Sequence, residues 1–389
     1  MASYEKRGDT WRYRISLGKN PKTNKYEYIS KSGFKRKSDA KHHAEMVERQ
    51  IRLDEYIAPS TISFDAVVGE WLEEYSKDVK ISSVRARKKA TKISQNKFGP
   101  YPIQKISEHD YDKFINGLSG EYSTNYIKSI MTSTNMVFNY AVKHGYIKKS
   151  PHINVKLKKK KETVEELEND NIANNFLEKE ELLQFLKVAK HQQKPLNSFE
   201  LFTTLAYTGL RIGELLALKW TDIDTLNNTI SVTKTYYNPN NNKRKYEILT
   251  PKTKTSIATV PVDHNIIKML LDYKTNVQDT WKDELYNDND FIFTDNNGYP
   301  LVVKKISQWV QSIMSETDIK KAITPHSFRH TYCALLIEAG LHIKAIQERM
   351  RHGDINTTMN VYAKITKAHK KDASQKFNEL MRSVSDEIF

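Results

Sequence analysis

The sequence predicts a multidomain protein that is mainly α-helical and carries small β elements. Three observations support this prediction. The 389 residues suffice for roughly two or three domains that each bury a separate core. Apolar and polar residues alternate near the start of the chain and again within residues 229–262, as they do in strands. In most other segments the apolar residues recur at the spacing of an amphipathic helix.

Residues 1–56 are predicted to form a three-stranded sheet followed by a helix. Apolar and polar side chains alternate over residues 10–18, and residues 26–30 and 31–34 resemble two further strands. The helix is expected over residues 37–56. This segment is therefore a candidate small domain.

Two arginines, Arg12 and Arg14, lie on the polar side of the first predicted strand. A sheet with arginines on its open face can enter the major groove of DNA, so both are candidate DNA-binding residues. The alternative is an ordinary solvated face, because charged side chains commonly cover the outer side of a sheet.

Residues 62–155 are predicted to form a compact bundle of about four helices. Ser63 is a candidate N-cap of the first helix, whose apolar stripe begins at Phe64 and includes Trp71. The helix over residues 82–99 is strongly basic, so we expect it to contact phosphates. Its candidate DNA-binding residues are Arg85, Arg87, Lys88, Lys89 and Lys92.

Residues 156–173 change from basic to acidic, are poor in apolar side chains and are predicted to be an exposed linker. Residues 174–389 form the third predicted domain, which is mixed but mainly helical. Within it, Gly209 is expected to separate two apolar helices. At the C-terminal end, residues 374–389 place apolar side chains on roughly one helical stripe, which could pack on their own domain.

The net charge of +15 is concentrated in the first part of the chain. Residues 1–60 hold 14 Lys and Arg against 8 Asp and Glu, and residues 61–161 hold 19 against 9, whereas residues 162–389 hold 29 against 30. This distribution favours nucleic acid as a partner of the first two segments, with a solubilising surface as the alternative. No apolar run is long enough to span a membrane, no apolar leader begins the chain, and the single Cys333 excludes an internal disulfide. We therefore expect a cytoplasmic protein.

Four candidate catalytic residues carry positive charge or can donate a hydrogen bond. Arg211 begins an apolar helix, where a lone guanidinium is unfavourable unless an anion meets it; an internal ion pair with Glu214 is the alternative. Lys252 lies in a polar segment that resembles a hairpin tip, where lysines are usually solvated. His326 and Arg329, three residues apart, share one helix face and could bind one phosphate, although such a pair also occurs by chance.

His352 lies in a turn between two predicted helices, and Tyr362 follows on the second of them, so both could reach one pocket. Taken alone, Tyr362 is more simply interpreted as a core or surface residue. Together with the four cationic candidates it acquires a chemical role, because a phenol is a competent nucleophile for phosphoryl transfer once its proton is removed. The sequence lacks paired carboxylates for two metals, a Walker lysine loop and zinc-ligand spacing, so no cofactor or metal is expected.

Three segments, residues 208–220, 324–341 and 350–365, resemble the signature boxes of the tyrosine recombinases and, within them, the integrases of phages and conjugative transposons. The resemblance covers most of residues 174–370. One departure is Arg351, where the family usually has a glycine before the second histidine. The N-terminal part is similar to these integrases in layout: an arm-type DNA-binding domain over residues 1–56, followed by a SAM-like core-binding domain.

The resemblance implies a role for each candidate. Tyr362 would attack the scissile phosphate of duplex DNA, forming a 3′-phosphotyrosyl bond and freeing a 5′-hydroxyl. Arg211 and Arg329 would clamp the phosphate oxygens. The remaining roles would be these: Lys252 protonates the leaving oxygen, His326 helps to move the nucleophile's proton, and His352 donates a hydrogen bond to the phosphate.

The resemblance also implies partners. Four protomers would exchange strands between two duplexes, at core and arm sites, through a Holliday junction, without ATP or metal. The C-terminal segment would dock on a neighbouring protomer, and an excisionase and a host DNA-bending protein are possible accessory partners in the nucleoid of a prokaryotic host. The alternatives are a type IB topoisomerase, which would relax DNA without a partner site, and a non-catalytic architectural DNA-binding protein.

Overall fold

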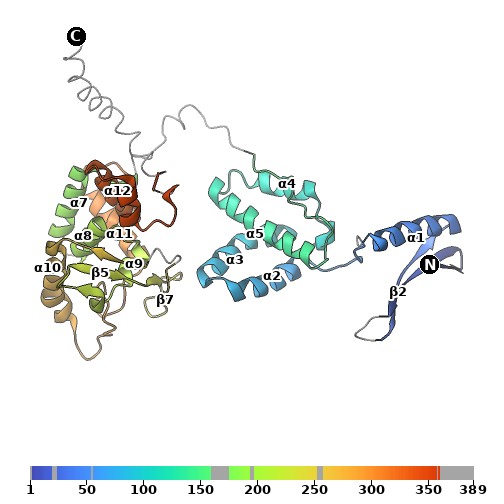
Figure 1. The fold of residues 1–389 in the computed structure, drawn as a ribbon, viewed down its shortest axis with the longest axis horizontal. Helices are drawn as coiled ribbons and strands as arrows, with labels where there is room; N and C mark the ends of the chain where they lie inside the picture. Colours follow the sequence, from blue (N-terminus) through green and yellow to red (C-terminus); the bar gives the residue numbers. More distant parts are fainter. Residues whose placement is uncertain are drawn as a thin grey trace, which may run out of the picture. The chain divides into compact units, whose positions relative to one another are not determined.

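The computed structural model describes residues 2–19, 24–53, 56–158, 175–192, 197–251, 257–356 and 358–359. The chain divides into two compact units, residues 1–161 and 162–389 (Figure 1). The first unit holds two hydrophobic cores, one under a small sheet and one inside a helical bundle. The second unit holds the largest core and the candidate catalytic residues.

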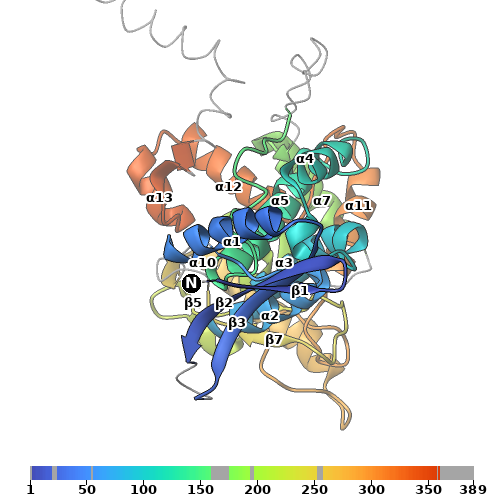
Figure 2. The same ribbon diagram turned by 90° about the vertical axis from the view of Figure 1, so that its right-hand side faces the viewer.

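The first core belongs to a three-stranded antiparallel sheet with one helix packed on it (Figure 2). Its strands, in the order β1-β2-β3, are β1 (Ser3–Arg7), β2 (Thr10–Lys19) and β3 (Tyr26–Phe34), and its helix is α1 (Lys37–Arg52). Tyr13 and Ile15 of β2 are buried against Ala44 and Val47 of α1. Their burial follows from the alternation in the sequence, which turns every second side chain of β2 toward the helix.

The number of strands agrees with the sequence prediction, but two of the assigned strands are wrong. Residues 26–34 form one strand rather than two, because the irregularity there is a β-bulge around Gly33 (φ +93°), not a turn. The missed strand is β1, an exposed edge strand whose residues show no apolar alternation. The N-cap of α1 is Arg36, which makes no side-chain capping hydrogen bond.

Four α-helices form the second core of the first unit. They are α2 (Phe64–Asp78), α3 (Ile81–Phe98), α4 (Glu108–Gly117) and α5 (Thr124–Lys143), with a short 3₁₀ turn, η1 (Ile103–Lys105), before α4. Ser63 caps α2 as predicted, because its hydroxyl accepts a hydrogen bond from the Ala66 N–H at 3.2 Å. Phe64 packs on Phe138 of α5, and the hydroxyls of Ser94 and Thr134 form a buried hydrogen bond between α3 and α5.

The second unit packs helices around small sheets. Its helices are α7 (Lys179–His191), α8 (Ser198–Thr208), α9 (Ile212–Leu216), α10 (His264–Tyr273), α11 (Val303–Ser315), α12 (Ser327–Glu338) and α13 (Ile343–Met350). Short helical turns are η3 (Trp220–Asp222), η5 (Lys274–Gln278) and η6 (Asp279–Trp281). The rings of Phe202 and Phe328 stack, and Phe185 packs edge-to-face on both, so the three residues join α8, α12 and α7.

The strands of the second unit form two sheets. One has the order β4-β5-β8 and comprises β4 (Ile223–Asp224), β5 (Thr229–Val232) and β8 (Ala258–Pro261). The other is the pair β6 (Thr235–Tyr237) and β7 (Glu247–Leu249). The strands that flank residues 252–256 therefore pair with β6 and β5, not with each other, and the expected simple hairpin there is wrong. Residues 290–295 contribute isolated bridges at Phe291 and Thr294 rather than a strand.

None of the helices in the described ranges is both long and apolar enough to cross a membrane.

Gly209 offers a test of how α8 is joined to α9. Its φ of +59° is left-handed, and a Cβ at this position would overlap the ring of Tyr332. Gly340, at the end of α12, has a similar φ of +75° but open space around it. We predict that Gly340→Ala lowers the free energy of unfolding by about 1 kcal/mol, and Gly209→Ala by about 1–3 kcal/mol more because of overpacking.

Chemical denaturation of both variants measures this difference. Equal losses of stability would contradict the close packing of Gly209 on Tyr332.

Candidate active site

Arg211 lies where the chain leaves α8 and enters α9. Gly209 ends α8, and Arg211 is the extended residue before α9. Glu214, one turn on, accepts hydrogen bonds from the Arg211 backbone N–H at 3.0 Å and from Arg211 Nη1 at 2.7 Å. The side chain of Glu214 is 3% exposed and that of Arg211 is 39% exposed. Arg211 is thus anchored through one nitrogen and remains accessible to a ligand.

Arg329 lies on α12 and is almost completely buried. Its Nη1 donates to the carbonyl of Gly209 at 2.5 Å, and its Nη2 donates to the carbonyl of Met350. Burial, followed by the charges of Arg211 and Arg351, lowers the pKa of Arg329 to about 9. The guanidinium is still protonated at neutral pH, and both of its bonded acceptors are carbonyls that carry no net charge.

Arg351 is the third guanidinium of the site, and the sequence analysis assigned it no role. Its Nη2 donates to Glu214 Oε2 at 3.1 Å, and both side chains are 3% exposed. Glu214 therefore divides its carboxylate between Arg211 and Arg351. The signal that could have found this residue is its position, because a long charged side chain is unusual where a helix ends in the left-handed conformation.

His326 begins α12 and lies edge-to-face with His330, with 5.0 Å between the ring centroids. The ring of His330 lies beside that of His326 because residues four apart in a helix share one face. Desolvation of the ring, followed by the charges of Arg329 and Arg211, lowers the pKa of His326, although the residue keeps a solvent-exposed edge. Its imidazole is therefore neutral at neutral pH.

His352 follows Arg351 in the turn after α13. Its Nδ1 lies 2.8 Å from the hydroxyl of the fully buried Thr358. Burial is the first cause that lowers the pKa of His352 to about 4, and Arg329 and Arg211 are the next. A neutral imidazole that accepts the Thr358 hydroxyl proton at Nδ1 carries its own hydrogen on Nε2, which can then donate to a ligand.

Depression of this pKa has a consequence for stability. The ordinary pKa of an unfolded histidine is about 6.5, above the value of about 4 in the folded chain. Protonation of His352 therefore favours the unfolded state, so stability falls as the pH drops from about 6.5 to about 4.

The structure brings Arg211, His326, Arg329 and His352 into one electrostatic cluster, since each histidine and Arg329 feels the charge of Arg211. Among the residues that the structure describes, three arginines lie there with one carboxylate, which pairs with Arg211 and Arg351, so two net positive charges remain. A partly buried excess of guanidinium charge calls for an anion, and phosphate is the anion that arginine donors match best. Lys252 and Tyr362 lie outside the described residues.

The candidate DNA-binding arginines of the small sheet are both ordered by neighbours on β3. Arg12 Nη2 donates to Ser30 Oγ at 3.0 Å. The Arg14 guanidinium lies 3.5 Å from the centroid of the Tyr28 ring. Both lie on the face away from α1, since the alternating residues Tyr13 and Ile15 are buried. This arrangement presents two partly fixed guanidinium groups on an open face.

The candidate residues of α3 divide into two groups. Arg85, Lys88, Lys89 and Lys92 are exposed and follow the i, i+3, i+4, i+7 spacing of one helix face. Arg87 is half-buried instead and donates to Ser133 Oγ of α5 at 3.4 Å. Arg87 therefore does not belong to the basic stripe formed by the other four residues.

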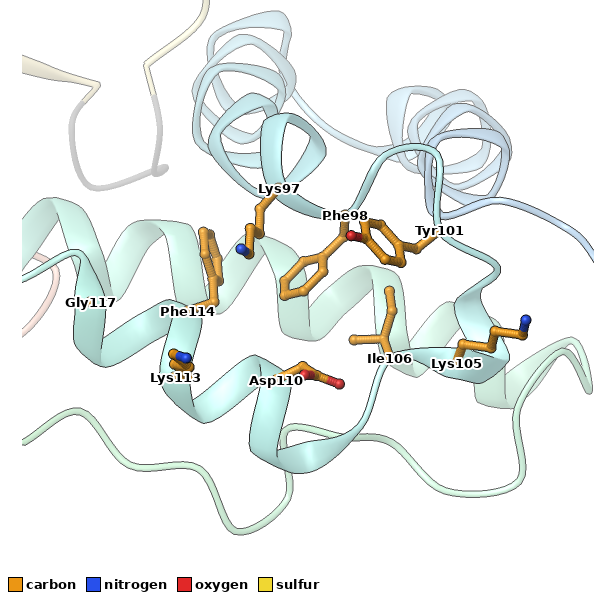
Figure 3. Close-up of a pocket in the computed structure, with 9 residues that line it drawn as sticks. All are labelled: Lys97, Phe98, Tyr101, Lys105, Ile106, Asp110, Lys113, Phe114 and Gly117. Atoms are coloured by element: carbon orange, nitrogen blue, oxygen red, sulfur yellow. The ribbon is translucent and has the colours of Figure 1, made fainter.

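A separate hollow of about 420 Å³ lies between α3 and α4 (Figure 3). Phe98, Phe114 and Ile106 contribute apolar surface to it, and Lys97 and Lys113 lie at its border. None of the five basic residues proposed on α3 lines this hollow. It therefore does not belong to the basic stripe.

Comparison with known proteins places this geometry in a family. The family model described as phage integrase family matches residues 175–369. Models described as an arm DNA-binding domain and as a phage integrase N-terminal SAM-like domain match residues 2–51 and 63–119. The integrase of Staphylococcus phage L54a is 31% identical over 82% of this chain and 94% of its own length.

The chain belongs to the phage integrase family. It is a tyrosine recombinase, an enzyme of site-specific recombination that breaks and rejoins DNA strands. Two solved structures share the fold of the integrase. The Tn1549 transposon integrase in complex with a circular intermediate DNA is 22% identical and covers 80% of this chain and 99% of that one, with a TM-score of 0.63. A lambda integrase tetramer bound to a Holliday junction is 15% identical and covers 90% and 95%, with a TM-score of 0.53.

The hydrogen bond between Thr358 and His352 gives a prediction for the integrase. Thr358→Val keeps the shape of the side chain but removes the hydroxyl, so the His352 ring loses the hydrogen bond that orients it. We expect the rate of covalent adduct formation on DNA to fall by about 10-fold, with DNA affinity little changed. Thr317→Val, after α11, removes a hydroxyl that bonds the Met314 carbonyl and the Ile319 N–H but no histidine, and is the matched control. Equal rates in the two variants would show that Thr358 does not orient His352.

Proposed function

We propose that the integrase carries out recombination with Tyr362 as the nucleophile and Arg211, Lys252, His326, Arg329 and His352 as the groups that act on the phosphate. The observation that carries this proposal is the cluster of three arginines around Glu214, which holds two net positive charges beside two neutral histidines. Charge stabilisation on the phosphoryl oxygens is the main requirement of phosphoryl transfer, and fixed guanidinium groups supply it without a metal.

The proposed first step conserves bond energy. The phenolate oxygen of Tyr362 bonds to phosphorus while the bond from phosphorus to the 5′-oxygen breaks. His326 takes the phenol proton, which its lowered pKa permits because the ring begins neutral. Lys252 gives a proton to the departing 5′-oxygen. A 5′-hydroxyl of the partner strand then reverses these steps and restores a phosphodiester.

The two histidines have different tasks in this scheme. His352 donates from Nε2 to a non-bridging oxygen, with its other nitrogen held by Thr358. His326 has no such bond and keeps a solvent-exposed edge, which suits a group that moves protons. Arg211 meets the phosphate from the accessible side, and Arg329 supports it from the buried side.

We propose that the first unit recognises duplex DNA at two kinds of site. The sheet, with Arg12 and Arg14, binds arm sites, and Tyr28 holds the Arg14 guanidinium flat for insertion into a groove. The stripe of Arg85, Lys88, Lys89 and Lys92 on α3 binds the phosphates of core sites. Domain limits of 1–56, 62–155 and 174–389, with a linker over 156–173, suit this division.

We propose that four protomers act together on two duplexes, as in the lambda integrase tetramer on a Holliday junction. An apolar groove of about 460 Å³ between α7, α8 and α12, which includes the exposed Leu183 and Tyr207, is a suitable acceptor for residues 374–389 of a neighbour. An excisionase and a host DNA-bending protein in the nucleoid are expected as accessory partners on the family resemblance alone.

Covalent trapping tests the proposed chemistry. The probe is a nicked duplex from the junction of the genetic element that encodes the chain, incubated with the integrase in EDTA. We expect a DNA-linked protein band on a denaturing gel, which Tyr362→Phe abolishes while it leaves DNA binding intact. The phenol oxygen is the only atom removed, so a loss of the band assigns the nucleophile.

The same Tyr362→Phe protein holds the uncleaved complex, and light scattering then measures how many protomers it contains. We expect four protomers on two duplexes, and fewer after removal of residues 374–389. A chain that binds junction DNA but forms no adduct would favour the non-catalytic architectural alternative. Relaxation of supercoiled DNA without a partner site would favour the type IB topoisomerase.

A further inference from the structure

Arg351 occupies a position that stability alone does not explain. It follows the last residue of α13 with φ +54° and ψ 44°, the left-handed conformation that glycine adopts without strain. A residue with a Cβ is strained in this conformation. The guanidinium is also buried, and its Nε and Nη1 have no hydrogen-bond partner among the described residues. Glycine at this position would remove both penalties, so the arginine calls for a functional reason.

The contacts of Arg351 point to Glu214. Glu214 Oε1 binds Arg211, and Glu214 Oε2 binds both the Arg211 backbone N–H and Arg351. Without Arg351, the carboxylate would be paired with Arg211 alone, and it would cancel most of the charge that Arg211 offers to a phosphate. With Arg351 present, the same carboxylate is shared between two cations.

A second link ties the same parts of the chain together. Arg329 bridges the carbonyls of Gly209 and Met350, and Glu214 bridges Arg211 and Arg351. Both links join the turn before α9 to the end of α13, directly before His352. The position of Arg211 is therefore coupled to that of the histidine turn through Arg351.

The net charge of the arginine cluster matches the charge of the transition state rather than that of the bound phosphodiester. A phosphodiester carries one negative charge, and the attacking phenolate adds a second. Three arginines and Glu214 leave two positive charges, whereas the loss of Arg351 would leave one. An interaction that is stronger in the transition state than in the bound substrate raises the rate without raising affinity.

We propose that Arg351 is a positioning residue of the recombination reaction: it binds Glu214 so that Arg211 keeps its charge and orientation for the scissile phosphate. This inference rests on the proposed function, because it takes a phosphate as the ligand of Arg211. Arg351 stands where the family usually has a glycine. We infer that it acts on the reaction through Glu214 and not through contact with DNA.

The test compares single-turnover adduct formation with DNA affinity, both measured on the nicked junction duplex. Arg351→Gly suits the left-handed backbone and should fold, which thermal unfolding checks. We expect its rate at saturating DNA to fall by about 10-fold or more, less than the 10²–10³ typical of a direct donor. The dissociation constant should change by less than about two-fold, since ground-state binding is largely independent of this charge. Arg351→Asn, which also tolerates the left-handed conformation, should behave in the same way.

A second substitution separates charge from packing. Adding Glu214→Gln to Arg351→Gly removes one negative charge and restores two net positive charges, so the rate should recover to within about three-fold of wild type. A purely structural role predicts the reverse, because the double variant loses a further ion pair. Arg349→Ala is the matched control, since Arg349 lies two residues earlier, is exposed and, among the described residues, bonds the Tyr332 hydroxyl and not Glu214.

Two results would overturn this proposal: a wild-type rate in Arg351→Gly, or a double variant no faster than the single one. Absence of any Tyr362-dependent adduct from the wild-type chain is a different result, because it refutes the proposed function itself and removes the premise of the proposal with it.

Discussion

The ion pairs of Glu214 with two arginines are the interaction on which the rest of the catalytic unit depends. The carboxylate is buried, so it must be paired, and it takes one partner from each of two segments that lie 137 residues apart in the chain. Arg329 joins the same segments through uncharged carbonyls. The aromatic core formed by α7, α8 and α12 holds Arg329 in place. Phe328, the residue before Arg329 on α12, packs in that core.

This constraint explains the protonation of the site. Guanidinium groups crowd two histidines that are also partly desolvated, and both effects lower the histidine pKa values. The imidazoles are therefore neutral, and the ring of His352 is held by a hydrogen bond between its Nδ1 and the Thr358 hydroxyl. The arginines thus supply permanent positive charge, and the neutral histidine rings can accept or donate protons. Phosphoryl transfer without a metal needs both functions.

Much of the fold follows from local patterns in the sequence. Helical periodicity and capping residues such as Ser63 locate the helices, and the alternation around Tyr13 and Ile15 locates β2. Edge strand β1 was missed because an exposed strand needs no apolar face, and the single strand 26–34 was divided between residues 30 and 31, close to the bulge around Gly33. The spacing of the signature boxes identified Arg211, His326, Arg329 and His352 as candidates. It did not identify the ion pair of Arg351 with Glu214, because a contact between residues far apart in the chain produces no periodic pattern in the sequence.

The central claim is that the three-arginine cluster exists to meet the charge of one phosphate. The most direct measurement compares two nicked junction duplexes that differ only at the scissile position, one with an ordinary phosphate and one with a neutral methylphosphonate. Thermal unfolding of the Tyr362→Phe integrase with each duplex reports how much the bound charge stabilises the catalytic unit. The account predicts a higher Tm with the charged phosphate than with the neutral group, and no such difference at a phosphate several nucleotides away. Equal Tm values for the two duplexes would contradict it.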